Sequence, residues 1–392
     1  MRIAVLGAFG LMAEAALHDL AANPRVRSIL AADISLARAR AVLSKIPRRR
    51  KIKPVRVDIT DTGRARLALR GAQALLNCVW YEHNLKAMDL SLALKAHYVD
   101  LGGLFHMTLR QLARDGQFRR AGLRAALGCG STPGITNMMA ARMAPSFETI
   151  ATVAIYDASH DPALTEDFFL PPFSIRTMLA EYEQPAPVLL GGRMRAVPAH
   201  SHAEEIDFGE PIGRCRAATV IHSEAASLPG YLKRKGVKNL FFKIAYPEVV
   251  RRQLGFLASL GLSQDEPVRV AGRDVSPLQF ITELLSKRAA PPAGAPADFE
   301  VLRVKITGSR HGRPLVKTWD CQLRPTRRLC AGSMGVGFAG AIAAEMLVLG
   351  RTAAPAGAAA PESLLDCDAF FRELKARKTF RFEETITHPL PM

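Results

Sequence analysis

The chain has 392 residues, a hydrophobic content of 48% and a formal net charge of +17. This length is enough for two domains, and the apolar content is enough for packed cores, so wholesale disorder is excluded. No secretory leader precedes the first apolar strand, which is expected to begin at residue 2. The longest apolar run, 334–350, contains Glu345, so we expect a cytoplasmic protein without a membrane span.

The positive charge is concentrated in residues 1–130, which hold 22 Lys and Arg against 9 Asp and Glu. Such a surface suits an anionic cofactor and a carboxylate-bearing substrate. Nucleic-acid binding is the alternative, and the basic run 48–53 is its most obvious site. That run has no interleaved aromatic residues, so we expect a solvated loop and no nucleic-acid partner. The six cysteines form no C-x-x-C pair, which indicates reduced thiols and no metal site.

Strand and helix signals alternate through the first third of the chain. Strands are predicted at 2–6, 28–32, 54–57, 74–79, 98–101 and 123–127, and helices at 11–22, 35–45, 62–70, 84–96 and 108–120. This alternation predicts an α/β fold with a doubly wound parallel sheet, on which ligands bind at the carboxyl ends of the strands.

The first strand and the turn after it carry the most specific signal. Gly7 and Gly10 follow the strand, a helix begins at Leu11, and Asp33 ends the second strand 23 residues beyond Gly10. The G-x-x-G-x-x-A spacing, closed by Ala13, lets backbone approach a pyrophosphate at the helix N-terminus, while the acid accepts hydrogen bonds from a ribose. We therefore predict a Rossmann-type dinucleotide-binding domain over 1–130.

From Ser131 onward, strand-like and helical segments mix. Strands at 150–157, 187–197, 217–222, 240–246, 299–307 and 315–322, with helices at 174–182 and 247–260, predict an antiparallel sheet with helices in an α+β second domain over 131–330. A loop is expected at 289–298. The small-residue segment 335–349 predicts a helix that returns to the first domain within 331–352, and 353–392 reads as a linker and C-terminal tail.

Candidate site residues follow from these strand ends. For cofactor binding we predict Gly7, Phe9, Gly10, Leu11, Asp33, Asp58, Val79, Trp80, Asp100 and Gly102, and for substrate binding Tyr81, His83, Thr132, Asn137 and Lys243. The turn before the helix at 135–143 offers amide groups for a substrate carboxylate. The segment 219–224 alternates like a strand and would place His222 and Glu224 on one face as a proton relay. These two residues and Tyr81 are the catalytic candidates.

Several of these motifs together resemble the saccharopine dehydrogenase family, most closely its lysine 6-dehydrogenase and bacterial saccharopine reductase-like members. The resemblance lies in segments 7–13, 98–102, 130–137, 222–229 and 243–247 and in the glycine-rich helix after Gly332. It implies a nucleotide-binding domain with an inserted α+β substrate and dimerisation domain over 131–330, a homodimer, and hydride transfer at an amine or imine carbon. Thr132 stands where saccharopine-forming members usually carry an acid, which favours a simpler amino-acid amine.

The sequence therefore predicts an NAD(P)-dependent oxidoreductase that acts on the CH–NH group of an amino acid or diamine-type substrate. Asp33 favours NAD because its charge repels a 2′-phosphate, and the nearby Arg38 and Arg40 keep NADP open. A sensor or interaction protein that binds NAD without turnover is the alternative function.

Overall fold

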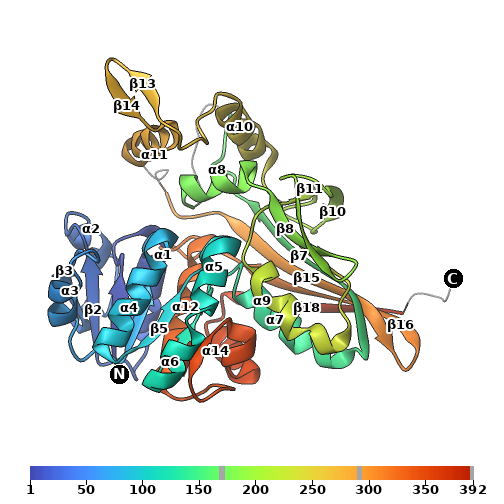
Figure 1. Ribbon diagram of the computed structural model, residues 1–392, viewed down its shortest axis with the longest axis horizontal. Coiled ribbons are helices and arrows are strands. Elements are labelled where there is room, and N and C mark those ends of the chain that lie inside the picture. The colour runs from blue at the N-terminus through green and yellow to red at the C-terminus, as the bar shows by residue number, and fades with distance from the viewer. Residues whose placement is uncertain (167–172, 289–293, 389–392) are drawn as a thin grey trace.

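The computed structural model describes residues 1–166, 173–288 and 294–388. Two sheets organise them (Figure 1). One belongs to an N-terminal α/β unit, and the other extends away from it as a long, open layer toward the C-terminus. This confirms the predicted fold class, because a parallel sheet is joined to a second, mixed α+β unit.

The first sheet has seven parallel strands in the order β17-β6-β5-β4-β1-β2-β3. The strands are β1 (Arg2–Leu6), β2 (Ser28–Asp33), β3 (Ile52–Arg56), β4 (Ala74–Asn77), β5 (His97–Asp100), β6 (Arg124–Ala126) and β17 (Gly357–Ala359). The strand order reverses between β1 and β4. Ligand crevices in open α/β sheets form at this kind of switch point.

Short helices connect the parallel strands on both faces of the sheet. They are α1 (Leu11–Ala22), α2 (Ala39–Ser44), α3 (Thr62–Ala68), α4 (Asn84–Leu94), α5 (Leu104–Leu112) and α6 (Asp115–Ala121), with single turns at Arg49–Lys51 and Tyr81–His83. Inward apolar residues of strands and helices form two cores, one on each face of the sheet. The single helix predicted at 108–120 is wrong, since α5 and α6 divide it.

Helix α12 (Ala331–Val348) packs directly against α1. A Cβ on Gly337 would lie 2.5 Å from the carbonyl oxygen of Met12 and 2.7 Å from the amide nitrogen of Ala16. The two backbones therefore approach closely, which explains the small residues of this segment. The helix is long and apolar enough to cross a membrane by length and composition, but 83% of it is buried inside the protein.

The C-terminal region differs from the predicted linker and tail. Its segment 353–361 contains β17, which pairs with β6 at the edge of the parallel sheet. Helices α13 (Pro361–Leu364) and α14 (Cys367–Ala376) follow, and β18 (Phe380–Thr387) pairs with β16 of the second sheet. This region therefore links both sheets, and the Ala- and Gly-rich composition of β17 reflects close packing rather than a free linker.

The second sheet contains the strands β7 (Thr149–His160), β8 (Ala186–Leu190), β9 (Arg193–Val197), β10 (Glu204–Asp207), β11 (Arg214–Thr219), β12 (Asn239–Ala245), β15 (Phe299–Arg310), β16 (Arg313–Leu323) and β18. Strands β7 and β12 run parallel to each other, whereas the other pairs are antiparallel. The predicted antiparallel sheet is thus wrong in one pairing, because α8 and further strands intervene between β7 and β12.

Four helices accompany this sheet. They are α7 (Ile135–Met143), α8 (Ile175–Glu183), α9 (Glu224–Tyr231) and α10 (Glu248–Ser259), with short turns at Ala144–Ser146 and Lys233–Lys235. Beyond α10, a small hairpin of β13 (Val268–Val270) and β14 (Arg273–Val275) leads to α11 (Pro277–Arg288), and these elements project from the body of the molecule (Figure 1). The loop predicted at 289–298 lies partly outside the described residues.

The basic run 48–53 has structural contacts. Lys51 Nζ donates to the carbonyl of Asn23 at 2.7 Å, and an Arg48 guanidinium nitrogen donates to the carbonyl of Ala22 at 3.0 Å. These carbonyls lie at the C-terminal end of α1, where helix carbonyls lack intrahelical partners and favour cations. Two of the basic residues therefore serve to hold the end of a helix.

Candidate active site

The glycine turn after β1 adopts the geometry that its spacing predicts. Gly7 has a φ of +66°, and a Cβ there would lie 2.9 Å from the carbonyl oxygen of Cys78. Gly10 has an ordinary φ of −77° and directly precedes α1. Its backbone conformation does not require glycine, so the missing side chain instead lets a ligand approach the N-terminus of α1. Together, the two glycines leave backbone exposed toward the N-terminus of α1, where a pyrophosphate is favoured.

Asp33 is held in place by this same turn. The amide of Phe9 donates to Asp33 Oδ2 at 3.1 Å, and the amide of Ser35 donates to Oδ1 at 3.2 Å. The carboxylate therefore sits at the carboxyl end of β2 beside the turn, with lone pairs left for ribose hydroxyls. Asp58 ends the neighbouring strand, where Thr60 donates two hydrogen bonds to it and lowers the pKa of its carboxyl group.

The side chain of Asp100 is buried and holds neighbouring loops of the protein in place. This corrects its prediction as a residue that contacts the cofactor. The side chain is 1% exposed. It accepts hydrogen bonds from the amides of Gly102 (3.0 Å) and Gly128 (2.7 Å) and from the side chain of Gln111. The residue thereby fixes the loops after β5 and β6, and Gly102, with a φ of +130° against Pro133, remains beside the crevice.

The residues after β4 face the second unit. Val79 lies directly beside Gly7, because a Cβ added to Gly7 would be 3.0 Å from Val79 Cγ1. The rings of Trp80 and Tyr81 lie 4.3 Å apart, and the Arg176 guanidinium lies 5.2 Å from the Trp80 ring centroid. Burial raises the pKa of Tyr81. His83, at the start of α4, lies near Asp58 on the nucleotide side. The structure gives no contact that joins His83 to the second unit among the described residues.

The turn at 129–137 leads into α7 as predicted, but its groups are already engaged. The amides of Ile135 and Thr136 donate to the carbonyls of Gly130 and Ser131, so they are not free for a substrate carboxylate. Asn137 is 1% exposed and donates to Ser227 at 3.3 Å and to Glu362 at 3.1 Å. This burial argues against its predicted contact with substrate.

Thr132 remains at the crevice and bridges the two units. Its hydroxyl donates to Asp157 Oδ2 at 3.0 Å, and Asp157 lies near the end of β7. Thr108 makes a second bridge, since its hydroxyl lies 3.1 Å from that of Ser223. These contacts place the carboxyl ends of the parallel strands against one end of the second sheet.

Ionisable side chains gather on that end of the second sheet, and we call them the carboxylate cluster. Its members are Asp157 of β7, Glu181 of α8, His222 of the β11–α9 loop, Glu224 of α9 and Glu300 of β15. Burial raises the pKa of Asp157 to about 6 and that of Glu181 to about 7. Burial and the charge of Asp157 also raise the pKa of Glu300 well above its usual range.

The partners of these carboxylates are hydroxyl groups and an imidazole. Tyr246 donates to Glu181 at 2.5 Å, Thr136 donates to Glu224 at 3.2 Å, and Glu224 also contacts His222 Nδ1. Within the described ranges, no Lys or Arg forms an ion pair with any of the four carboxylates. Burial without a cationic partner therefore favours the neutral form of these acids, and a bound cation would favour their ionised form.

His222 and Glu224 come together, but not as neighbours on a strand. Strand β11 ends at Thr219, His222 lies in the following loop, and Glu224 begins α9. The alternation prediction is wrong because the helix start turns the chain after Ser223, which brings both side chains to the same point. Burial is the largest single effect and lowers the pKa of His222. The charge and hydrogen bond of Glu224, with the charges of Glu181 and Asp157, together raise the pKa overall.

Lys243 lies on the opposite face of the second sheet. Its ammonium pairs with Glu204, which also accepts a 3.0 Å hydrogen bond from Tyr156. His222 instead stacks on Phe242, the next residue of β12. Because side chains alternate along a strand, Lys243 points away from the cluster, and its predicted contact with substrate is wrong.

Comparison with known proteins agrees with this geometry. The family model described as saccharopine dehydrogenase NADP binding domain matches residues 3–126, and the model described as saccharopine dehydrogenase C-terminal domain matches residues 130–379. The chain belongs to the saccharopine dehydrogenase family. This family membership makes the protein an NAD(P)-binding oxidoreductase that acts on amine-type substrates.

Individual relatives are more distant. The chain is 26% identical over 304 residues to carboxyaminopropylagmatine dehydrogenase of Synechocystis sp., which covers 74% of this chain and 73% of the relative. It is 26% identical over 177 residues to carboxynorspermidine synthase of Vibrio cholerae, covering 45% of this chain and 41% of the relative. The structure of saccharopine dehydrogenase (L-Glu forming) from Saccharomyces cerevisiae has a TM-score of 0.77 at 15% identity, covering 98% of this chain and 99% of that one, so it shares the fold.

The residues of this saccharopine dehydrogenase family member fit a nicotinamide dinucleotide. Gly7 and Gly10 would accept the pyrophosphate, because no side chain stands between their backbone and the N-terminus of α1. Asp33 would hold the adenosine ribose. The nicotinamide end would then lie beyond β4 beside Trp80, facing the second unit. No group of three or more metal-binding side chains occurs in the part of the chain that the structure describes.

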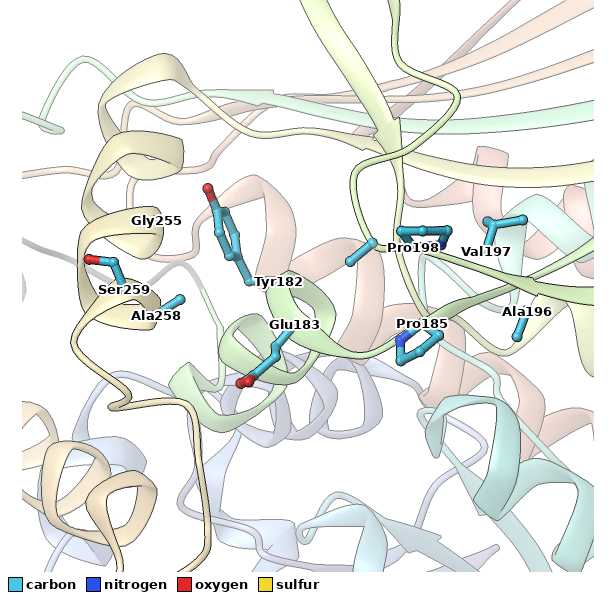
Figure 2. Close-up of a pocket in the computed structure, with 10 residues that line it drawn as sticks. Tyr182, Glu183, Pro185, Ala196, Val197, Pro198, Gly255, Ala258 and Ser259 are labelled. Carbon is cyan, nitrogen blue, oxygen red and sulfur yellow. The ribbon is translucent and has the colours of Figure 1, made fainter.

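A hollow in the surface of this family member lies elsewhere. A cavity of about 780 Å³ is lined by residues of α8, β9 and α10, among them Tyr182, Pro198 and Gly255 (Figure 2). Its lining includes Glu183, but no residue of the carboxylate cluster and none of the glycine turn. This hollow is therefore separate from the carboxylate cluster and from the glycine turn.

Sequence reasoning missed Asp157, Glu181, Glu300 and Arg176 as site residues. Each stands alone in the sequence, without a motif around it. A signal existed only for Asp157, an acid at the end of an otherwise apolar strand. The others reach the crevice through the fold of the second unit.

Proposed function

We propose that the protein transfers a hydride at the CH–NH group of an amino acid or diamine-type substrate, with NAD as its preferred cofactor, in either the oxidative or the reductive direction. The observation that carries this proposal is the carboxylate cluster beside the nucleotide crevice. Its buried acids have hydroxyl and imidazole partners rather than cations, and such a group favours a positively charged amine.

The chemistry needs the amine in its neutral form. A substrate ammonium first gives its proton to a base, for which we assign His222, oriented by Glu224. The nitrogen lone pair then forms the C=N bond as the C–H bond releases a hydride with its electron pair. The nicotinamide supplies the hydride acceptor when it is bound. In reverse, the protonated His222 supplies the proton as the imine is reduced.

The remaining cluster residues position the substrate. Asp157 and Glu181 would attract the ammonium group and hold it near His222, because negative charge close to a cation favours the charged form. Thr132 keeps Asp157 oriented. Tyr81, at the nucleotide side of the crevice, stays a candidate for contact with the substrate.

The names of two relatives narrow the proposal. Carboxyaminopropylagmatine and carboxynorspermidine, which appear in those names, are amines that carry a carboxyl group. The cationic nitrogen of such a substrate would suit the buried acids here. We extend the proposal to amines of this class.

The proposal is tested by incubating the purified protein with NAD or NADP and a panel of L-lysine, cadaverine, agmatine and norspermidine with their carboxyalkyl derivatives. Reduced nicotinamide is followed by absorbance, and the reverse reaction is assayed with amine and aldehyde pairs. We expect turnover by the wild type and a loss in Glu224→Gln, with the exposed Glu183→Gln as control. Binding of NAD without turnover of any pair in either direction would overturn the proposal and favour a sensor.

We also propose a cytoplasmic homodimer. The six cysteines are free thiols, which suits a reducing compartment. The dimer rests on the family resemblance of the sequence. Light scattering of the purified protein tests it, and a monomeric mass at micromolar concentration would overturn it.

A further inference from the structure

Arg176 and Trp80 meet across the crevice from different units. Arg176 comes from α8 beside the second sheet, whereas Trp80 follows β4 of the parallel sheet. The guanidinium carbon lies 5.2 Å from the centre of the Trp80 ring, within the range of a cation–π contact. The pair therefore lies where the nicotinamide end of the nucleotide crevice faces the second unit.

Among the described residues, both side chains keep a buried donor without a partner. Arg176 Nε and Trp80 Nε1 are inaccessible to solvent and form no hydrogen bond within these ranges. Buried polar groups are rarely left unpaired, because an unsatisfied donor that has lost its water destabilises the fold. Arg176 also forms no ion pair with a carboxylate in the described ranges. Two unpaired donors, one of them cationic, suit a ligand with anionic oxygen atoms.

The planar guanidinium specifies which anion fits best. Arginine binds carboxylates through parallel N–H donors, and the contact with the Trp80 ring restricts where the guanidinium can lie. The indole N–H adds a further donor of fixed direction. This arrangement suits a carboxylate better than a lone halide ion.

The pair and the carboxylate cluster lie at different strand ends. Trp80 follows β4, whereas Thr132, which bridges to Asp157, follows β6, and β5 lies between these strands. Neighbouring strands are separated by about 4.8 Å, so the strands β4 and β6 that lead to the two bridges are about 10 Å apart. The crevice is thus polar, with a cation at one end and buried acids at the other.

We infer that Arg176 and Trp80 form a subsite for the carboxylate of the substrate, while the carboxylate cluster receives its amine. This inference rests on the proposed function and deepens it, because it selects amino acids or carboxyalkyl amines over plain diamines. Arg176 is the specificity-determining residue of this subsite. It orients the substrate so that the reacting amine points to His222.

The first test measures binding without turnover. The chain has 2 tryptophans, and Trp319 is buried against Phe371 and Phe382 in the second unit, so a fluorescence change lost in Trp80→Phe reports on Trp80. The protein is titrated with glutarate, with neutral glutaramide and with sodium chloride at equal ionic strength. We expect saturable quenching by glutarate alone, and at least tenfold weaker binding in Arg176→Gln. The exposed, ion-paired Arg252→Gln serves as control.

The second test compares a carboxylated amine with its counterpart that lacks the carboxyl group, such as L-lysine with cadaverine. We expect Arg176→Gln to raise KM for the carboxylated amine at least tenfold and to leave the plain diamine unchanged. Equal losses for both amines, or glutarate binding that is unaffected by Arg176→Gln, would overturn the inference. If glutarate binds through Arg176 but no amine is turned over, the subsite stands and the proposed function fails.

Discussion

The imidazole of His222 lies flat on the ring of Phe242, with ring centroids 3.9 Å apart and planes inclined by 16°. This stacking fixes the plane of the imidazole, and contact with Glu224 engages its Nδ1. Nε2 is therefore the nitrogen left for a substrate or a water molecule. A base whose ring plane and proton-bearing atom are both fixed is suited to repeated proton transfer.

Replacing Glu224 by Gln should shift the pH dependence of amine oxidation. Oxidation rises with pH as His222 loses its proton, and Glu224 is the largest of the charges that raise the pKa of His222. Removal of that charge lowers this pKa, so the ascending limb of kcat/KM should move to lower pH. The maximal rate should fall about 100-fold, in keeping with the loss of an oriented base. Steady-state rates between pH 5 and 10 measure both effects.

If Glu224 had only a structural role, Glu224→Gln would lower the rate without shifting its pH dependence. Glu183→Gln, on the exposed side of α8, should keep the wild-type profile and rate. If Glu224→Gln lowers the rate without moving the ascending limb, His222 is not the titrating base.

Replacing Glu181 by Gln should stabilise the protein at alkaline pH. Burial raises the pKa of Glu181 from 4.5 to about 7, so the folded protein binds a proton more tightly than the unfolded chain does. Stability from this group is present at low pH and is lost as pH rises through the folded value. The variant should therefore gain up to about 3 kcal/mol over the wild type at pH 8 and little at pH 4.5.

Thermal unfolding at the two pH values measures this difference. Tyr246 keeps an oxygen acceptor in Glu181→Gln, so its hydrogen bond survives the change. If Glu181→Gln is destabilised equally at both pH values, the contacts of Glu181 stabilise the fold and its buried charge does not destabilise the fold at alkaline pH.

Alanine at Gly7 and at Gly10 should have different effects. At Gly7 the φ of +66° and the carbonyl of Cys78 at 2.9 Å oppose a side chain, so Gly7→Ala should cost about 1–3 kcal/mol of stability. At Gly10 the backbone is ordinary and the nearest atom is 3.3 Å away. Gly10→Ala should fold nearly as well but bind NAD at least tenfold more weakly. Urea unfolding and NAD titration separate the two, and full NAD affinity in Gly10→Ala would contradict the assigned pyrophosphate site.

The sequence predicted the parallel strands β1 to β6 because most of them are local apolar runs between helices. Strand β1 and helix α1 were predicted at the observed residues. The C-terminal segment 353–392 was misjudged, since β17 and β18 are short or polar and gain stability from strands far away in the chain. Pairing between distant segments leaves no local pattern for a sequence to show.

The predictions for the site residues succeeded or failed for the same reason. Asp33 and the glycine turn were predictable because their geometry depends on consecutive residues. The prediction for Lys243 was wrong because the pairing of β12 with β7 decides which residues of β12 share the face of the carboxylate cluster. That pairing joins distant segments of the chain. The contact of His222 with Glu224 was predicted, but through a strand that ends at Thr219.

Replacing Asp33 by Ala should narrow the preference between the two cofactors. The carboxylate, held by the amide of Phe9, accepts ribose hydroxyls and repels a 2′-phosphate. The wild type should therefore be stabilised more by NAD than by NADP, and Asp33→Ala should lose NAD affinity while gaining relative affinity for NADP. Thermal shifts with each nucleotide measure this, with the exposed Asp89→Asn as control. Equal shifts by both nucleotides in the wild type would refute the role of Asp33.

Replacing Arg377 by Met should strongly destabilise the fold. Arg377 joins the C-terminal segment to α1 through two hydrogen bonds to Asp19, at 2.9 and 3.1 Å, and pairs with Glu373. Burial raises the pKa of Asp19 in spite of this partner. Arg377→Met would leave a buried carboxylate without its cation, which costs about 3–5 kcal/mol. The exposed Arg372→Met is the matched control.

A second substitution separates the lost pairing from lost packing. Asp19→Asn removes the stranded charge, so the double variant with Arg377→Met should recover part of the stability that Arg377→Met loses. Urea midpoints of the four proteins form a double-mutant cycle with a coupling energy above about 1 kcal/mol. If Arg377→Met unfolds at the wild-type midpoint, the C-terminal segment does not stabilise the nucleotide-binding unit through this pair.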